Sequence, residues 1–194
     1  MRATLLSLLL LPLCSQAQIV YDHAVLDGIV QGDQRGHGSL TLRSASGSPT
    51  RGFDVTYHRF EWNLDPSVRA ISGSVATHFT TTTDLDTLWF DLSDSLTVYD
   101  VTRNGVALPF VHARERLDIV FHTNITIGTS DSVTVSYAGV PPTTGFGSFE
   151  TGTHNGTPVL WTLSEPYGAS DWWPSKEDLF DKAARSATTE APAR

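Results

Sequence analysis

Hydrophobic residues between positions 53 and 137 tend to occupy every second position, with polar residues between them. Such alternation is typical of a strand that has one face on a core and the other in water. The cleanest run is residues 96–102 (LTVYDVT). The remaining runs are at residues 53–62, 71–80, 87–92, 106–111, 117–121 and 132–137. Repeated strands of this length predict an all-β domain, built as an antiparallel β-sandwich.

Turn signals and one irregularity refine this pattern. Asn104-Gly105 fits a two-residue hairpin loop, because both residues tolerate a positive φ. In residues 53–62 the apolar positions slip once, which we interpret as a β-bulge. The core is expected to include Leu88, Phe90, Val98, Val133, Val135 and Tyr137.

Residues 1–17 have the features of a secretory signal peptide. Arg2 supplies a positive charge, residues 5–13 are apolar, and the Ser-Gln-Ala sequence at residues 15–17 fits a cleavage site. The apolar run is too short to cross a bilayer, so no membrane span is expected. We therefore expect a secreted or periplasmic protein, with a lipid-anchored Cys14 as the alternative. Cys14 is the single cysteine, so the mature chain would contain no disulfide.

Composition divides the remaining chain into three parts. Residues 18–51 are rich in Gly, Ser and Arg, which predicts a flexible N-terminal extension with at most a short helix at residues 21–30. Residues 52–183 carry the strand pattern and form one domain. Residues 184–194 contain no large apolar residue and are predicted to be a disordered tail. The net charge of −8, without a basic stripe, argues against nucleic acid as a partner.

Alternation stops at residues 161–183 (WTLSEPYGASDWWPSKEDLFDKA), which contain three of the five tryptophans. The proline that follows Glu165 keeps this residue extended at a corner of the chain. A carboxylate on such a corner, beside aromatic residues, can recognise a cation. Trp172 and Trp173 either pack at the edge of the domain or form a platform for carbohydrate.

The charged residues after the tryptophans predict a short helical segment within residues 167–182, near the C-terminus. Glu177 and Asp181 would lie one helical turn apart on its solvated face. The sequence contains no phosphate-binding glycine loop and no G-x-S-x-G nucleophile motif, so it gives no sign of those chemistries.

The order of residues in the Trp-rich segment matches a family pattern, approximately T-Q-x-E-P-x-x-A-R-x-x-F-P-C-x-D-E-P-x-x-K-A. The matching positions are Thr162, Glu165, Pro166, Ala169, Pro174, Lys182 and Ala183. The departures are Leu163, Ser170, Trp173, Ser175 and Leu179, and Glu177-Asp178 reverse the acidic pair. Ile71-x-Gly73-x-Val75 and Tyr137-x-Gly139 are shorter matches. Residues 53–183 thus resemble the N-terminal domain of the aminopeptidase N family of zinc metallopeptidases, in the version of a secreted bacterial branch.

The resemblance implies a saddle-like β-sandwich that takes part in substrate binding. In the family, the Glu of this motif binds the free α-amino group of a peptide, so the resemblance gives Glu165 that role and makes peptide N-termini the expected partner. Leu163 stands where the family has a Gln beside the pocket for the first side chain. The resemblance therefore implies a more apolar wall at Leu163.

The family's zinc site has no counterpart in this sequence. That site uses an H-E-x-x-H helix and a G-x-M-E-N loop, and neither H-E-x-x-H nor M-E-N occurs here. We therefore expect an incomplete N-terminal domain without catalytic residues, cofactor or activity of its own, with zinc only in a full-length relative. The chain stops where the catalytic domain would begin, as a truncated or frameshifted gene product or a fragment would. The alternatives are a stand-alone secreted sandwich that binds peptide or carbohydrate, or a product without function.

Overall fold

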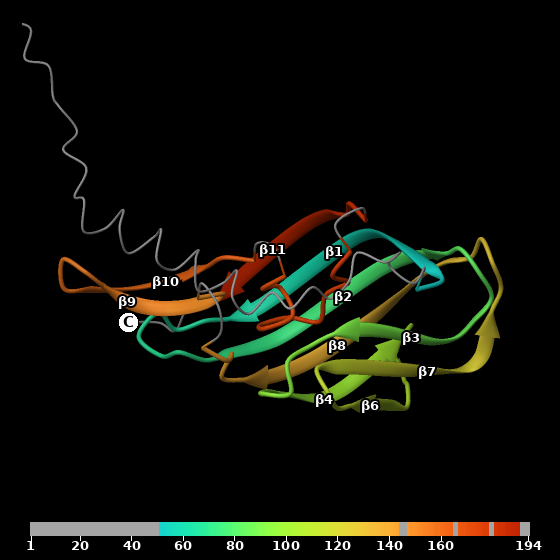
Figure 1. The fold of residues 1–194 in the computed structure, drawn as a ribbon, viewed down its shortest axis with the longest axis horizontal. Coiled ribbons are helices and arrows are strands. Elements are labelled where there is room, and N and C mark those ends of the chain that lie inside the picture. Colours follow the sequence, from blue (N-terminus) through green and yellow to red (C-terminus); the bar gives the residue numbers. More distant parts are fainter. Residues whose placement is uncertain (1–50, 144–146, 165–166, 179–180, 191–194) are drawn as a thin grey trace, which may run out of the picture.

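The computed structural model describes residues 51–143, 147–164, 167–178 and 181–190 (Figure 1). Within these ranges every residue lies in a strand, a turn or a loop, so the all-β prediction is confirmed for this part of the chain. The same residues include no helix of the length and apolarity needed to cross a membrane. The predicted signal peptide and nearly all of the N-terminal extension lie outside the described residues.

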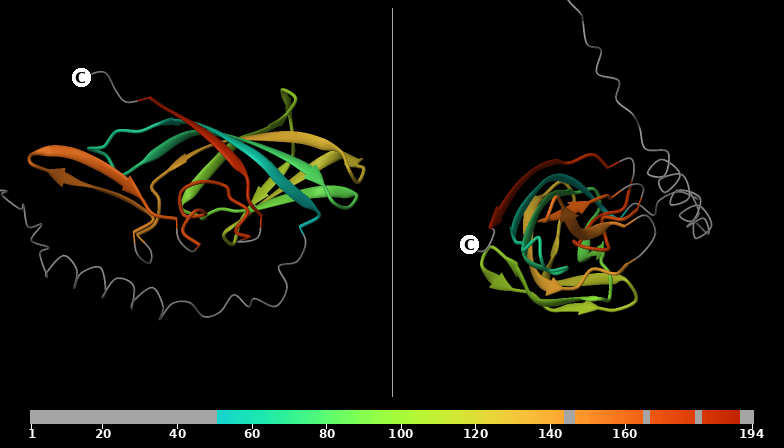
Figure 2. Two further views of the ribbon diagram at one scale, coloured as in Figure 1. Left: turned by 90° about the horizontal axis from the view of Figure 1, so that it is seen from above. Right: turned by 90° about the vertical axis from the view of Figure 1, so that its left-hand side faces the viewer.

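Strands of very different length make up the described fold. In chain order they are β1 (Phe53–Asn63), β2 (Ile71–Thr81), β3 (Leu85–Asp91), β4 (Leu96–Arg103), β5 (Val106–Ala107), β6 (Phe110–His112), β7 (Arg116–Ile125), β8 (Ser130–Gly139), β9 (Phe149–His154), β10 (Thr157–Thr162) and β11 (Ala184–Glu190). A six-stranded sheet has the order β11-β1-β2-β8-β4-β5, and a three-stranded sheet has the order β3-β7-β6. Strands β9 and β10 form a separate hairpin, which extends from one end of the molecule (Figure 2).

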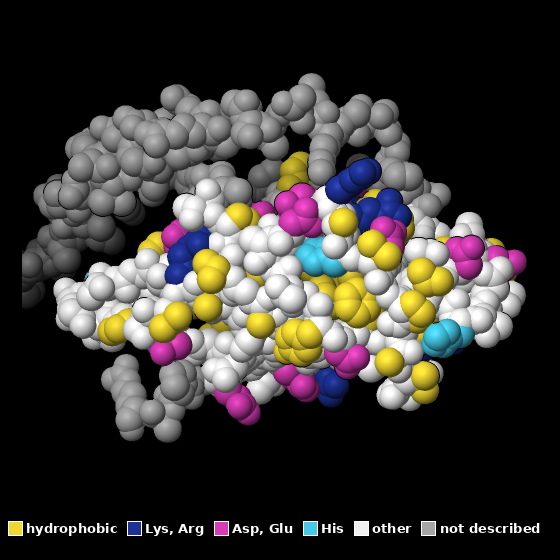
Figure 3. All heavy atoms as spheres, turned by 90° about the horizontal axis from the view of Figure 1, so that it is seen from below, with side chains coloured by type: hydrophobic (Ala, Val, Ile, Leu, Met, Phe, Trp, Pro, Cys, Tyr) yellow, Lys and Arg dark blue, Asp and Glu magenta, His cyan; other side chains and the backbone are white. Residues whose placement is uncertain are grey.

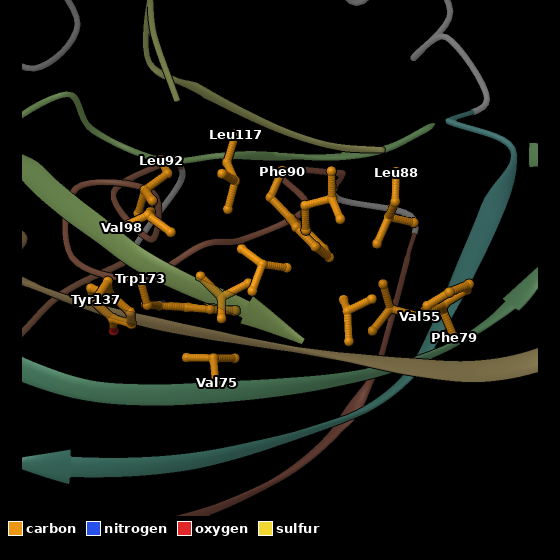
Figure 4. Close-up of a cluster of buried hydrophobic side chains, with 14 of the residues drawn as sticks. Val55, Val75, Phe79, Leu88, Phe90, Leu92, Val98, Leu117, Tyr137 and Trp173 are labelled. Atoms are coloured by element: carbon orange, nitrogen blue, oxygen red, sulfur yellow. The ribbon is translucent and has the colours of Figure 1, made fainter. Parts of the chain in front are cut away.

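The six-stranded and three-stranded sheets share one hydrophobic core. Phe53 of β1 and Phe90 of β3 meet edge to face, with ring centroids 5.8 Å apart. Figure 4 shows Leu88, Phe90 and Leu117 of the smaller sheet opposite side chains of the larger one. All six residues that were predicted to form the core are buried. Two sheets facing each other across shared apolar side chains is the arrangement that a sandwich requires.

Strand β1 contains the irregularity that the sequence predicted. Its pairing with β2 shifts register between Val55 and Tyr57, so the buried positions change from odd to even numbers. The bulge therefore turns His58 into the core, while Tyr57 is only half-buried. The predicted hairpin is also confirmed, because Asn104 and Gly105 have φ values of 52° and 76° between β4 and β5.

The predicted helical segment within residues 167–182 is wrong for the residues that the structure describes there. Residues 167–178 and 181–183 are turns and loops, and Ser175 forms an antiparallel bridge with Asp91 at the end of β3. Pro174 has no N–H group and disfavours a helical conformation at Trp173. Backbone bonding to a distant strand thus replaces the bonds within a helix.

The predicted disordered tail from residue 184 is also corrected. Ala184–Glu190 is strand β11, which pairs in parallel with β1 from Tyr57↔Ala184 to Asn63↔Glu190. Every side chain of β11 is exposed, so no alternation of apolar residues could reveal it in the sequence. Its backbone hydrogen bonds to β1 make it a strand, and residues 191–194 lie outside the described residues.

Core truncation should have a large effect on stability. Leu88→Ala removes a fully buried side chain and is expected to lower the free energy of unfolding by about 2–5 kcal/mol. Val111→Ala is the matched control, because Val111 is 60% exposed and should change stability by less than about 0.5 kcal/mol. Urea denaturation followed by circular dichroism measures both. Equal losses in the two variants would contradict the assigned core.

Candidate functional site

The Trp-rich segment, residues 161–183, follows strand β10, and its described part returns into the core. Trp172 and Trp173 are only 8% and 9% exposed. The ring of Trp172 lies 5.0 Å from that of Trp62, and the ring of Trp173 meets Phe60 edge to face at 4.9 Å. Figure 4 shows Trp173 among the buried side chains. The two rings therefore pack inside this chain and cannot serve as a carbohydrate platform.

A buried pair of hydrogen bonds joins the Trp-rich segment to the middle of the large sheet. The indole Nε1 of Trp62 donates to the Tyr137 hydroxyl at 3.0 Å, and this hydroxyl donates to the carbonyl oxygen of Trp172 at 2.9 Å. Burial raises the pKa of Tyr137 far above its ordinary value, so the hydroxyl keeps its proton. Both the donor and an acceptor function of the phenol are thereby used.

The predicted substrate-binding residues lie at the start of this segment. Leu163 follows β10, is half-buried, and donates its backbone N–H to Ser148 O at 3.0 Å. Glu165 lies outside the described residues, but the residues around it are held. Gly168 N donates to Ser164 O at 3.1 Å, and the indole of Trp172 donates to Ser164 Oγ at 3.3 Å. The structure thus places Leu163, and it holds Ser164 and Gly168, which lie on either side of the undescribed residues 165 and 166 and of Tyr167.

Asp91, at the end of β3, binds the middle of the Trp-rich segment. Asp91 exchanges two backbone hydrogen bonds with Ser175, at 2.8 and 3.0 Å. Its carboxylate accepts hydrogen bonds from the backbone N–H of Glu177 at 3.1 Å and from the guanidinium of Arg51. Nothing in the local sequence marked Asp91, because its partners are far away along the chain.

A buried ion pair fastens the end of the segment to β1. Lys176 and Asp181 form this pair, and their side chains are 8% and 5% exposed. Lys176 Nζ also donates to Phe53 O at 2.8 Å, and Asp181 Oδ2 accepts from Val55 N at 3.2 Å. Because both side chains are buried, removal of either partner would leave the other charge without its counter-ion in the interior. The predicted solvated face is therefore wrong at Asp181.

Glu177 is half-buried, so it also departs from the predicted solvated face. Its Oε1 accepts a hydrogen bond from the backbone N–H of Ser170 at 3.1 Å. Burial raises the pKa of Glu177, and the nearby carboxylates of Asp91 and Asp171 act in the same direction. This carboxyl group therefore holds a loop rather than facing water.

A pocket of about 280 Å³ lies beside the ion pair, and its lining includes His58, Trp173 and Glu177. His58 stacks on Phe60 with ring centroids 5.6 Å apart, and its Nδ1 lies 3.0 Å from Thr77 Oγ1. Burial lowers the pKa of His58 to about 4, so the ring is neutral at pH 7. Counting alternate positions back from Phe60, once the bulge is allowed for, would have identified His58 as buried.

The described residues do not form a zinc site. No group of three or more His, Cys, Asp or Glu side chains within these ranges is placed to hold a metal ion. Nε2 of His112 lies 3.2 Å from Leu92 O, and Nε2 of His122 lies 3.2 Å from Ala107 O. The histidines visible in Figure 3 lie in separate places on the surface.

Comparison with known proteins supports the fold. No family model and no curated protein matches the chain at a significant level. An M1 zinc metallopeptidase from Deinococcus radiodurans has a TM-score of 0.64 at 23% identity, over 73% of this chain and 33% of that chain. A point mutant from the same organism, bound to the substrate Tyr-Ser-Ala, gives 0.62 at 21% identity, over 73% and 33%. Leukotriene A4 hydrolase from Saccharomyces cerevisiae gives 0.63 at 21%, over 77% and 26%.

The chain therefore spans about a third or less of the length of these proteins. At this level of identity the similarity establishes a shared fold. Residues 1–50 and 191–194 lie outside what the structure describes.

The buried imidazole of His58 should make the fold less stable in acid. The pKa of His58 is about 4 in the folded chain, whereas the ordinary pKa of a free imidazole is 6.5, so only the unfolded chain gains a proton between these values. Stability should therefore fall as the pH falls from 6.5 to 4, by about 3 kcal/mol from this residue. Glu177 acts in the opposite direction, because its folded pKa is raised.

Comparison of two variants isolates this contribution. His58→Phe can keep the ring stacking, and we expect it to remove the acid-dependent loss, as measured by urea denaturation at pH 7 and pH 4. Glu177 is present in both proteins, so its contribution cancels in the difference. His122→Gln changes an exposed ring and should leave the wild-type profile unchanged. Parallel profiles of wild type and His58→Phe would show that His58 is not the group responsible.

Proposed function

We propose that this chain is the substrate-binding N-terminal domain, or a fragment, of a zinc-dependent aminopeptidase. The fold it shares with M1 zinc metallopeptidases supports this function. The observation that carries it is the anchoring of the Trp-rich segment, which holds both sides of the predicted amine-binding residue Glu165. The finer parts of the proposal are the saddle-like sandwich, the secreted bacterial branch and export through residues 1–17.

Glu165 would bind the free α-amino group of a peptide. A carboxylate and an ammonium group form a charge-assisted hydrogen bond, which is stronger than a bond between neutral groups. Leu163, two residues earlier and half-buried, would present an apolar wall to the first side chain of the peptide. This pairing favours peptides that begin with an apolar or aromatic residue.

By itself the chain would bind peptides without cleaving them. Peptide hydrolysis in a zinc peptidase requires a metal-bound water and a nearby general base. The sequence lacks the H-E-x-x-H motif that supplies two ligands and this base, and the described residues do not fit zinc. Zinc would belong to a full-length relative.

A stand-alone secreted module that binds peptide or carbohydrate is the alternative. The burial of Trp172 and Trp173 excludes these two rings as its carbohydrate platform. Trp161 is 50% exposed on the β9–β10 hairpin, where its ring lies over Gly152, and we take it as the exposed tryptophan for such a module. Binding that depends on Trp161 but not on Glu165 would favour this alternative.

Titration with Tyr-Ser-Ala tests the amine-binding role directly. We expect weak binding to the full chain, with a Kd on the order of 1 mM, and loss of binding when the peptide is N-acetylated. Glu165→Gln should weaken binding about tenfold, because it removes the charge but keeps the shape. Glu61→Gln is the control, since Glu61 is exposed on β1. NMR chemical shifts report the affinity, and equal binding of both peptides would exclude the role.

Assays of peptidase activity test the proposal that the chain alone does not cleave peptides. Purified chain with added zinc is expected to release no nitroaniline from aminoacyl-nitroanilide substrates above the buffer rate. A chelator should therefore change nothing. Turnover that a chelator abolishes and zinc restores would contradict the proposal.

A further inference from the structure

We propose that Asn155 is a site of spontaneous covalent modification, at which the side-chain amide is lost as ammonia with the help of the neighbouring His154. The site is the loop of the β9–β10 hairpin, at one end of the molecule (Figure 2). His154 pairs with Thr157, so Asn155 and Gly156 form a two-residue loop between the strands. All four residues are exposed, so water has access to the loop. This inference is independent of peptide binding.

The backbone nitrogen of Gly156 is accessible for a reaction. The φ values of Asn155 and Gly156 are 49° and 80°, as the type I′ turn requires. In such a turn the hydrogen bonds across the hairpin come from the flanking pair, here His154 and Thr157. A Cβ atom at Gly156 would meet no atom beyond the adjacent residues within 4 Å, so the described chain leaves space around this residue. Gly156 N is therefore exposed next to the Asn155 side chain.

The reaction forms a succinimide ring within the chain. Gly156 N gives its proton to water and attacks Cγ of Asn155, so a new N–Cγ bond forms. The bond from Cγ to Nδ2 then breaks, and Nδ2 leaves as ammonia. The nucleophile and the carbonyl carbon belong to adjacent residues, so the step is intramolecular. It requires rotation within the Asn155 backbone, which the end of a hairpin allows when its last pair opens.

Water completes the reaction. A water molecule adds to one of the carbonyl carbons of the ring and breaks its bond to Gly156 N. Addition at Cγ gives an aspartyl residue, and addition at the backbone carbonyl gives an isoaspartyl residue. Water is the co-reactant and ammonia is the leaving group, so nothing is oxidised or reduced.

His154 is placed to protonate the leaving nitrogen. Its Nε2 lies 3.3 Å from Nδ2 of Asn155. Nδ2 must gain a proton before its bond to Cγ breaks, because an amide anion is a very poor leaving group. A protonated imidazole can give this proton and regain it from water, and histidine is the side chain suited to proton transfer near neutral pH. His154 is therefore the general acid of this step.

The products differ from asparagine in charge and in backbone length. Either product places a carboxylate in the loop, which adds a negative charge to a chain whose net charge is −8. The isoaspartyl product also adds a methylene group to the main chain, so the loop no longer fits the two-residue turn. The end of the β9–β10 hairpin should therefore be looser in modified molecules.

A second Asn-Gly loop in the same chain provides the comparison. Asn104 and Gly105 connect β4 to β5, have φ values of 52° and 76°, and are exposed. A Cβ atom at Gly105 would likewise meet no atom beyond the adjacent residues within 4 Å. The preceding residue is Arg103, whose Nε donates to Asp131 Oδ2 at 2.7 Å. A guanidinium group keeps its protons at neutral pH, so Arg103 cannot act as a general acid at Asn104.

Storage of the full chain at pH 7, followed by peptide mapping with mass spectrometry, tests the proposal. Conversion raises the mass by about one unit, and chromatography separates aspartyl from isoaspartyl peptides. We expect both products at residue 155, and faster conversion of Asn155 than of Asn104. His154→Gln should slow conversion of Asn155 about tenfold, because glutamine is polar but is not an acid. Conversion of Asn104 should be unchanged and is the internal control in each sample.

Three results would overturn the proposal. Equal rates at Asn155 in the wild type and in His154→Gln would exclude the general acid. An intact Asn155 in a sample where Asn104 has reacted would exclude the site. An aspartyl product without any isoaspartyl product would indicate direct hydrolysis by water in place of the succinimide. Urea denaturation checks that His154→Gln is as stable as the wild type, and the ratio of the two rates in the wild type is a test that needs no variant.

Discussion

The hydrogen bonds that Tyr137 makes to Trp62 and Trp172 are the interaction on which the rest of the molecule depends. They lie inside the core, where each polar atom must have a partner because water cannot supply one. Together with the backbone bridge between Asp91 and Ser175, they hold a segment without regular structure against the core. The bare Gly73 between Trp62 and Tyr137 makes this contact possible. The contacts among Trp62, Tyr137 and Trp172 therefore connect the six-stranded sheet to the Trp-rich segment.

The sequence predicted the strands better than the chain around them, and the reason is physical. Alternating burial requires alternating apolar residues, so the core residues and the bulge in β1 could be predicted from the sequence. The Asn104-Gly105 hairpin could be predicted because its two residues tolerate a positive φ. Strand β11 has no alternation of apolar residues, because its side chains are all exposed and its backbone pairs with β1. The charged residues after Pro174 predict a helix, but Ser175 pairs with Asp91 of β3 and the side chain of Lys176 binds the backbone of β1 instead.

The candidate site, too, could be predicted only in part from the sequence. The spacing of residues 162–183 indicated where the segment begins and which carboxylate to consider, and Leu163 lies in the described part of it. The contacts that hold the segment could not be predicted, because they join residues far apart in the chain. Asp181 binds the backbone of Val55, and the carboxylate of Asp91 binds the backbone of Glu177. Such pairs become visible only when the fold brings the strands together.

The central proposal is that Glu165, in the Trp-rich segment, binds the α-amino group of a peptide. A crystal structure of the full chain with Tyr-Ser-Ala bound tests it most directly. The account predicts the α-amino nitrogen of the peptide within about 3 Å of the Glu165 carboxylate. It also predicts that the bonds from Tyr137 to Trp172 and from Trp172 to Ser164 are retained. A peptide bound elsewhere, or a loop that must release Trp172 to admit it, would contradict the account.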